Sequence, residues 1–254
     1  MDTLNALVRW LHIVGGILWL GMLYFLNFVW APYSISMDGE TRKKVAPELL
    51  PRAMFWGRWA ALFTWVTGVF LLFSVYYFGG LMVREASVQE FGIGSSLLAL
   101  GVVLVLAYGY DLIARSPIGK NNRVFAVVGF VLIGLVTYGF IEVGGFGYRA
   151  YLIHMGTLFG TIIIMNGFMR MFPSQRKVLA ALKEGTPPDP ALLTLVMTRA
   201  KHATYLSVPL VWTMINFHTV VPGGESWLYF PLVVGISWLV VALLYKKAAK
   251  LKGA

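Results

Sequence analysis

With 254 residues, the chain is 58% hydrophobic and only 13% charged, and its mean hydropathy is +0.73. This composition leaves too few polar side chains to cover a soluble protein of that length, and it also excludes a disordered chain, a coiled coil and a collagen-like repeat. The formal net charge of +10 would suit a nucleic-acid partner, but the basic residues gather between apolar stretches, so we expect a membrane protein and no nucleic acid.

Seven apolar stretches follow one another along the chain, each long enough to cross about 30 Å of hydrocarbon as a helix of about 20 residues. The strands of an outer-membrane barrel would be about 10 residues long with strict alternation, which these stretches do not show. The sequence therefore predicts an all-α integral membrane protein, a bundle of about seven transmembrane helices. The predicted spans are residues 5–30, 53–78, 93–114, 124–141, 148–172, 201–221 and 227–245.

The Lys and Arg residues predict the orientation of the bundle. In or beside the segments after the first, third, fifth and seventh spans lie 18 of the 21 Lys and Arg residues. By the positive-inside rule, these segments face the cytoplasm. We therefore expect the N-terminus outside and the C-terminus in the cytoplasm, which requires an odd number of spans.

The segment between the fifth and sixth spans is long and basic. A turn at Pro187, Pro188, Asp189 and Pro190 separates two short helical segments in it. We interpret the region near residues 173–200 as a cytoplasmic connector, and residues 1–254 as a single transmembrane helical domain.

Histidine carries the main chemical signal. Because the chain has no cysteine, metal or redox chemistry must use histidine, methionine, carboxylates or a bound cofactor. Ionisable groups inside spans are costly and are functional candidates by default. An imidazole can also bond neighbouring helices together, an alternative that stays open for each single histidine and is harder to hold for all of them. The four candidate metal ligands within or at the ends of spans are His12, His154, His202 and His218.

The spacing pairs two of these histidines. His12 and His154 should both lie about 10 Å inside the outer face, at about 1.5 Å of rise per residue. Two neutral imidazoles from two helices of a bundle commonly hold a b-type haem, whereas zinc would need carboxylates at matching depth. His202 and His218 are about 24 Å apart along the sixth span, so they cannot serve one ligand.

Arginines accompany two of the histidines. Arg9 precedes His12 by three residues and Arg199 precedes His202 by three, so each lies one turn nearer the membrane surface. Haem propionates need such partners, which predicts an outer haem and an inner one, hence one or two haem b groups. For the inner haem the second axial ligand would be a methionine, Met165 or Met169.

Glycines follow both outer histidines. Gly16 follows His12 and Gly156 follows His154, which leaves bare backbone for a flat macrocycle. For Gly156, which forms a G-x-x-x-G pattern with Gly160, a close helix contact is an equally good interpretation.

Several strings resemble the membrane domain of the bacterial cytochrome-c-linked urate oxidases (urate hydroxylases), and the likeness spans most of the chain. The resemblance carries over all four histidines and implies an oxidoreductase of the bacterial inner membrane that passes electrons toward a c-type cytochrome. A more distant similarity links the chain to the small haem-binding membrane protoporphyrinogen oxidases. The strings are RWLHIVGGILWLG at residues 9–21, YDLIARSPIG at 110–119, HMGTLFGTIIIMN at 154–166, PSQRK at 173–177, RAKHATYLSVPL at 199–210 and MINFH at 214–218.

Two departures from the family pattern bear on the function. Those enzymes end in a fused cytochrome c domain, whereas we expect this chain to use a separate acceptor. In the second span the family has a charged pair where this sequence has Arg58 and Ala60. The substrate is therefore left open between urate and a related purine. In either case His218 is the candidate base, and Arg149, beside the outer glycine-rich loop, is the candidate partner of an anionic substrate.

We thus expect a haem b membrane oxidoreductase. Its partners would be the lipid bilayer, a c-type cytochrome or another electron acceptor, and a small-molecule substrate, and a homo-oligomer is compatible with the sequence. A proton or solute transporter or channel is the alternative from another class, although only Pro209 suggests a broken helix. A non-catalytic haem-binding membrane subunit is the third hypothesis.

Overall fold

The computed structural model describes residues 2–79, 93–216, 218–219 and 221–251. The described chain is a bundle of long helices, and its elements follow the predicted spans in order. They are α1 (Asp2–Tyr24), η1 (Phe25–Trp30), α2 (Ala31–Ser36), α3 (Gly39–Leu71), η2 (Leu72–Tyr77), α4 (Ile93–Arg115), α5 (Pro117–Lys120), α6 (Asn122–Tyr138), η3 (Gly139–Val143), α7 (Tyr148–Met165), η4 (Asn166–Met171), α8 (Phe172–Lys183), α9 (Pro190–Asn216) and α10 (Tyr229–Ala248).

Six helices of the described residues are long and apolar enough to cross a membrane. This confirms an all-α, multi-pass membrane protein. The predicted span at residues 201–221 falls on α9, which has 27 residues and lies against α7 and α10 but is not among the six. Helix α9 is less apolar because it carries Arg199, Lys201 and His202, and its buried face also includes Thr204, Ser207 and Thr213.

Two helices begin earlier than the sequence suggested. Asp38 caps α3 by accepting a hydrogen bond of 2.9 Å from the backbone N–H of Thr41, so this helix starts 14 residues before the predicted span at residue 53. The connector at residues 173–200 contains α8 and a loop at the prolines. The second of its expected short helices is instead the beginning of α9, which continues to Asn216.

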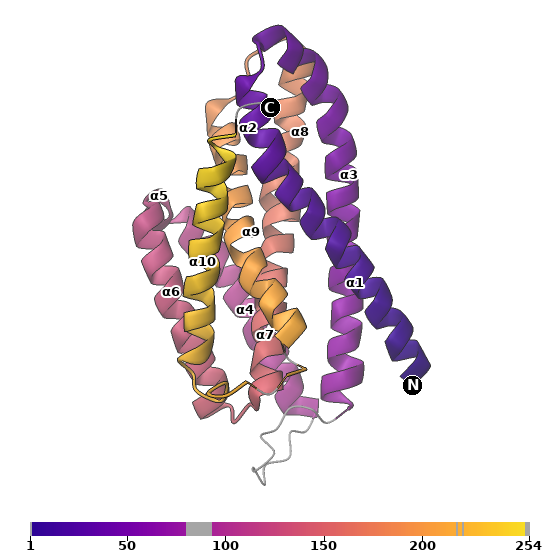
Figure 1. Cartoon of the computed structure of the whole chain (residues 1–254), viewed down its shortest axis with the longest axis vertical. Helices are drawn as coiled ribbons and strands as arrows, with labels where there is room; N and C mark the ends of the chain where they lie inside the picture. The colour runs from indigo at the N-terminus through magenta and orange to yellow at the C-terminus, as the bar shows by residue number, and fades with distance from the viewer. Residues whose placement is uncertain (1, 80–92, 217, 220, 252–254) are drawn as a thin grey trace.

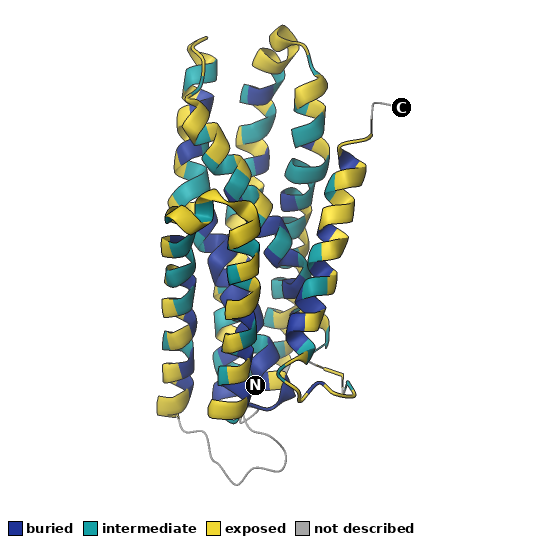
Figure 2. Ribbon diagram, turned by 90° about the vertical axis from the view of Figure 1, so that its left-hand side faces the viewer, coloured by how far each residue is buried: buried dark blue, intermediate teal, exposed yellow. Residues whose placement is uncertain are grey.

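Helix α7 lies at the centre of the bundle. Of its apolar window 61% is buried inside the protein, against 33% or less for the other five spans. Figure 2 shows the buried residues gathered in the interior and the exposed ones on the outer faces of the helices. Helix α1 slants across α3, which in turn contacts α7 (Figure 1). A side chain on α7 is therefore the best shielded from lipid.

Four of the long helices continue through a π-helical stretch, η1 to η4. Such wide turns are uncommon and often lie at functional sites. Here η2 carries Tyr76 and Tyr77, and η4 carries Asn166 and Arg170. These are the residues that contact the candidate site residues described below.

Candidate functional site

We call the end of the bundle where α7 begins and α9 ends the outer end, and the opposite end the inner end, after the orientation that the sequence predicts. His12 lies on α1, in the outer half. Its Nδ1–H group donates a hydrogen bond of 2.9 Å to the carbonyl oxygen of Thr64 on α3, and Nδ1 is 3.1 Å from Oγ1 of Thr67. A Cβ atom at Gly68 would come within 2.9 Å of Cε1 of His12, so glycine at 68 makes room for the imidazole. The Nδ1 bond leaves the lone pair on Nε2.

His154 lies on α7 and is fully buried. Its Nδ1–H group donates a hydrogen bond of 2.7 Å to the carbonyl oxygen of Ala150, one turn earlier on the same helix. Nε2 accepts a hydrogen bond of 3.0 Å from the hydroxyl of Tyr77. The rings of Phe140 and Phe146 lie 5.7 and 5.0 Å from the imidazole, centroid to centroid. His154 thus has the same tautomer as His12, inside an aromatic box.

Both imidazoles lie against the same helix, at successive levels. His12 touches α3 at Gly68, whereas His154 is bonded to Tyr77 in η2, which continues α3. These contact points are about 13 Å apart along the axis, at about 1.5 Å per residue, and the long side chain of Tyr77 shortens the difference. His154 therefore lies nearer the outer end than His12, so the equal depth predicted from the spacing is wrong.

A positive cluster lies at the outer end. Arg9 and Arg149 both act electrostatically on Tyr76 and on His218, so side chains from α1, η2, α7 and the turn after α9 converge there. His218 lies beyond the end of α9. Partial burial and the two arginines lower its pKa below the ordinary value of 6.5, which keeps the imidazole neutral at pH 7. We call Arg9, Tyr76, Arg149 and His218 the outer cluster.

His202 has a different environment. Asn166 donates a hydrogen bond of 3.1 Å to the hydroxyl of Tyr110, and this hydroxyl is hydrogen-bonded to Nδ1 of His202 at 2.7 Å. Nδ1 of His202 is thus engaged by a tyrosine of α4. The ring stacks on Phe125 with centroids 4.5 Å apart. These contacts bond helices to one another, which was the alternative left open for any single histidine.

Arg199 is not turned toward open space. It is 2% exposed, and it donates two hydrogen bonds of 3.1 Å each, one to Oδ1 of Asn166 and one to Oδ1 of Asp111. Arg170 donates to both oxygens of the same carboxylate. Arg115 lies 3.7 Å away from it, at i,i+4 on the same helix. We call Asp111, Arg115, Arg170 and Arg199 the inner charged cluster.

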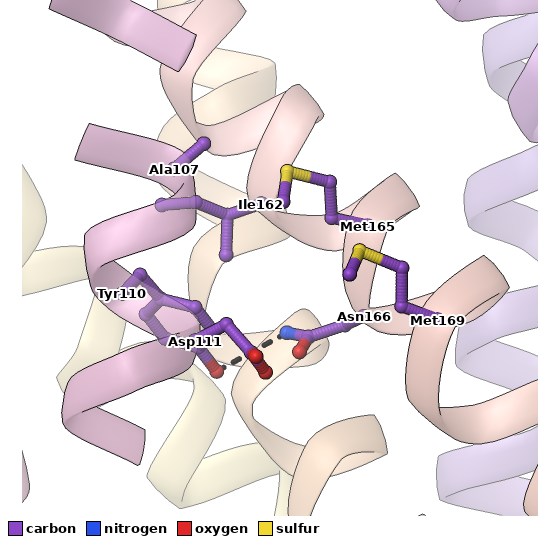
Figure 3. Close-up of a pocket in the computed structure, with 7 residues that line it drawn as sticks. All are labelled: Ala107, Tyr110, Asp111, Ile162, Met165, Asn166 and Met169. Atoms are coloured by element: carbon purple, nitrogen blue, oxygen red, sulfur yellow. Dashed lines mark hydrogen bonds between the residues drawn. The ribbon is translucent and has the colours of Figure 1, made fainter. Parts of the chain in front are cut away.

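Met165 and Met169, the candidate ligands of an inner haem, face the same network. Together with Tyr110, Asp111 and Asn166 they line a void that Figure 3 shows in close-up. The void is too narrow to hold a water molecule. The inner haem therefore stays a prediction of the sequence, and no space for it lies among these side chains.

The two candidate glycines differ in what surrounds them. A Cβ at Gly16 would only touch Thr64, at 3.8 Å. A Cβ at Gly156 would overlap Oγ1 of Thr213 and come within 2.7 Å of Cε of Met214, both on α9. Gly156 therefore lets α7 approach α9, which is the helix-contact interpretation rather than the cofactor wall.

Sequence reasoning missed the two tyrosines that bond the histidines. Tyr77 and Tyr110 sit in apolar runs, and tyrosine near a span end is typical of the membrane interface. Only the tertiary structure brings each within bonding distance of an imidazole far away in the sequence. Among the described residues, no group of three or more His, Cys, Asp or Glu side chains gathers to hold a bare metal ion.

Comparison with known proteins gives one match. The family model described as urate oxidase N-terminal matches residues 37–252. No curated protein and no solved structure matches the chain.

Proposed function

The chain belongs to the urate oxidase N-terminal family, and on this basis we propose that it is a haem b membrane oxidoreductase of the bacterial inner membrane. In this proposal it oxidises urate or a related anionic purine at its outer end. The electrons pass to a c-type cytochrome or a similar acceptor.

One observation carries the proposal. The outer cluster lies at the same end of the bundle as half-buried His12 and fully buried His154, whose Nδ1 atoms are both bonded to backbone carbonyls. Histidines that ligate a metal through Nε2 usually donate their other ring N–H in this way, which orients the ring and raises its basicity. A binding site for an anion and a pair of potential ligands thus adjoin.

The donor set fits a b-type haem. Nε2 of His12 has no hydrogen-bond partner among the described residues, so its lone pair is available. Nε2 of His154 is available once the Tyr77 hydroxyl turns away. His12 and His154 would be the axial ligands, and Arg9, one turn outward from His12, would neutralise a propionate. Because the two imidazoles lie at different levels of the bundle, binding one iron would require α1 and α7 to close that difference. A bound haem b supplies one-electron redox chemistry to the site.

The outer cluster suits the substrate. Urate is an anionic purine, and the guanidinium group of Arg149 can donate two parallel hydrogen bonds to such an anion. His218, kept neutral by its surroundings, can accept a proton as the purine is oxidised. Oxidation of the purine releases two electrons and two protons, and the electrons reduce two molecules of a one-electron acceptor.

Turnover by the purified chain tests the proposal. The full chain in lipid nanodiscs is mixed with urate and oxidised cytochrome c, and both urate loss and cytochrome reduction are recorded. We expect two cytochrome molecules reduced per urate consumed, and loss of this activity in His218→Gln.

The matched control is Arg176→Gln on α8, an exposed arginine far from the outer cluster. It should leave turnover unchanged. If the protein contains haem but consumes neither urate nor a related purine, the proposed substrate class is wrong. Protein that transports urate across a vesicle membrane without oxidising it would favour the transporter hypothesis.

A further inference from the structure

The inner charged cluster is not used by the proposed oxidation. It joins α4, η4 and α9 at the inner end, far along the helices from the outer cluster. Asp111 has a side-chain exposure of only 6%, and it receives hydrogen bonds from Arg170 and Arg199.

The charges of this cluster do not balance. Among the described residues, the ion pairs of Arg115, Arg170 and Arg199 all go to the single carboxylate of Asp111. Three formal positive charges therefore face one negative charge. Arg199 and Arg170 are largely withdrawn from solvent, and the surplus positive charge beside one buried carboxylate is costly there, so a further anion would stabilise the folded protein.

The three arginines grade from buried to exposed. The side chain of Arg199 is 2% exposed, that of Arg170 is 27% exposed and that of Arg115 is 55% exposed. Arg170 donates hydrogen bonds from Nε and Nη2 to Asp111. These two bonds fix the orientation of its guanidinium group and leave Nη1 to bind another acceptor. Arg115 makes only the long contact of 3.7 Å. Arg199 thus lies at the buried end of the cluster and Arg115 at its solvent-accessible end.

We infer that the inner charged cluster binds the phosphate group of an anionic ligand between Arg170 and Arg115. The oxygen atoms of a phosphate can accept two parallel hydrogen bonds from one guanidinium group, and the phosphate supplies the negative charge that the cluster lacks. Basic pockets between membrane helices bind anionic lipid headgroups in this way. The void beside Tyr110 and Asn166, shown in Figure 3, is too narrow for a ligand, so the phosphate would lie outside it, beside Arg170 and Arg115.

Lipid retention measured by native mass spectrometry tests the inference. The full chain is prepared in nanodiscs of phosphatidylcholine with and without phosphatidylglycerol. A third arm adds inorganic phosphate to phosphatidylcholine discs, and thermal unfolding is followed in all three. The variants are Arg170→Gln and, as the matched control, Arg176→Gln, which removes one exposed arginine of α8 outside the cluster.

We expect one phosphatidylglycerol to stay on the wild-type chain and on Arg176→Gln, and to bind at least about tenfold more weakly to Arg170→Gln. Stabilisation of the wild type by inorganic phosphate alone, lost in Arg170→Gln, would also support the site and would make a soluble phosphate compound its ligand. Equal retention and equal stabilisation in all three proteins, or none in the wild type, would overturn the inference. If Arg170→Gln does not fold, Arg115→Gln replaces it, because Arg115 makes only the long contact to Asp111.

Discussion

The hydroxyl of Tyr77 donates a hydrogen bond of 3.0 Å to Nε2 of His154, the nitrogen through which a histidine would bind haem iron. The other ring nitrogen is already bonded to the carbonyl of Ala150. Tyr77 therefore competes with any metal for the one lone pair of this imidazole. The relationship allows the roles of the two residues to be separated by mutation.

Replacing Tyr77 by phenylalanine should tighten haem binding. The change removes one hydrogen bond between neutral groups, worth about 1 kcal/mol, which corresponds to roughly fivefold in affinity. Titration of haem into the haem-free protein measures the effect, and Tyr33→Phe, at an exposed tyrosine of α2, is the control. Weaker haem binding by Tyr77→Phe would mean that the phenol supports the bound state instead.

Replacing Arg149 by glutamine should weaken the binding of an anionic purine. Losing a charge-assisted pair of hydrogen bonds at the outer cluster should raise KM about tenfold or more and change kcat little. Steady-state kinetics measure both values. Arg149→Lys keeps the positive charge but cannot donate two parallel hydrogen bonds, so its KM should fall between those of the wild type and Arg149→Gln. A lower kcat at constant KM would instead place Arg149 in the chemical step.

The pH dependence of turnover should report on His218. Because its pKa lies below the ordinary value of 6.5, the imidazole can accept a proton at pH 7 and loses this ability only when the pH falls below the lowered pKa. Removing the positive charge of Arg149 raises the pKa of His218 toward its ordinary value. The acid limb of kcat/KM should therefore move to higher pH in Arg149→Gln, and an acid limb that does not move would rule out His218 as the base.

The two glycines of the G-x-x-x-G pattern should respond differently to alanine. Gly156→Ala pushes a methyl group into Thr213 and Met214, so overpacking should destabilise the protein by about 1 to 3 kcal/mol. A Cβ at Gly160 meets nothing within 4 Å, so Gly160→Ala should be tolerated. Thermal unfolding in the same detergent compares them, and equal stability of the two variants would contradict the close contact between α7 and α9.

Properties that depend on local sequence could be predicted. Hydropathy located the helices because lipid requires apolar side chains on the faces that it contacts. Helix α9 shows where this logic weakens. A helix enclosed by others, as α9 is by α7 and α10, need not be as apolar as one that faces lipid.

Contacts between distant residues could not be predicted. The bond from Tyr77 to His154 and the convergence of Arg170 and Arg199 on Asp111 depend on how the helices pack and rotate. The equal spacing of R-x-x-H at Arg9 and Arg199 suggested an outer haem site and an inner one. The structure separates them, because Arg199 is held by Asp111 whereas Arg9 belongs to the outer cluster.

The most direct measurement of the central claim is the haem content of the purified chain, determined from its absorption spectrum and by pyridine haemochrome. We expect b-type haem in the wild type and its loss in His12→Ala. We also expect its retention in Trp10→Ala, which removes an exposed side chain of the same helix. A colourless wild-type protein, or a His12→Ala variant with undiminished haem, would contradict this claim.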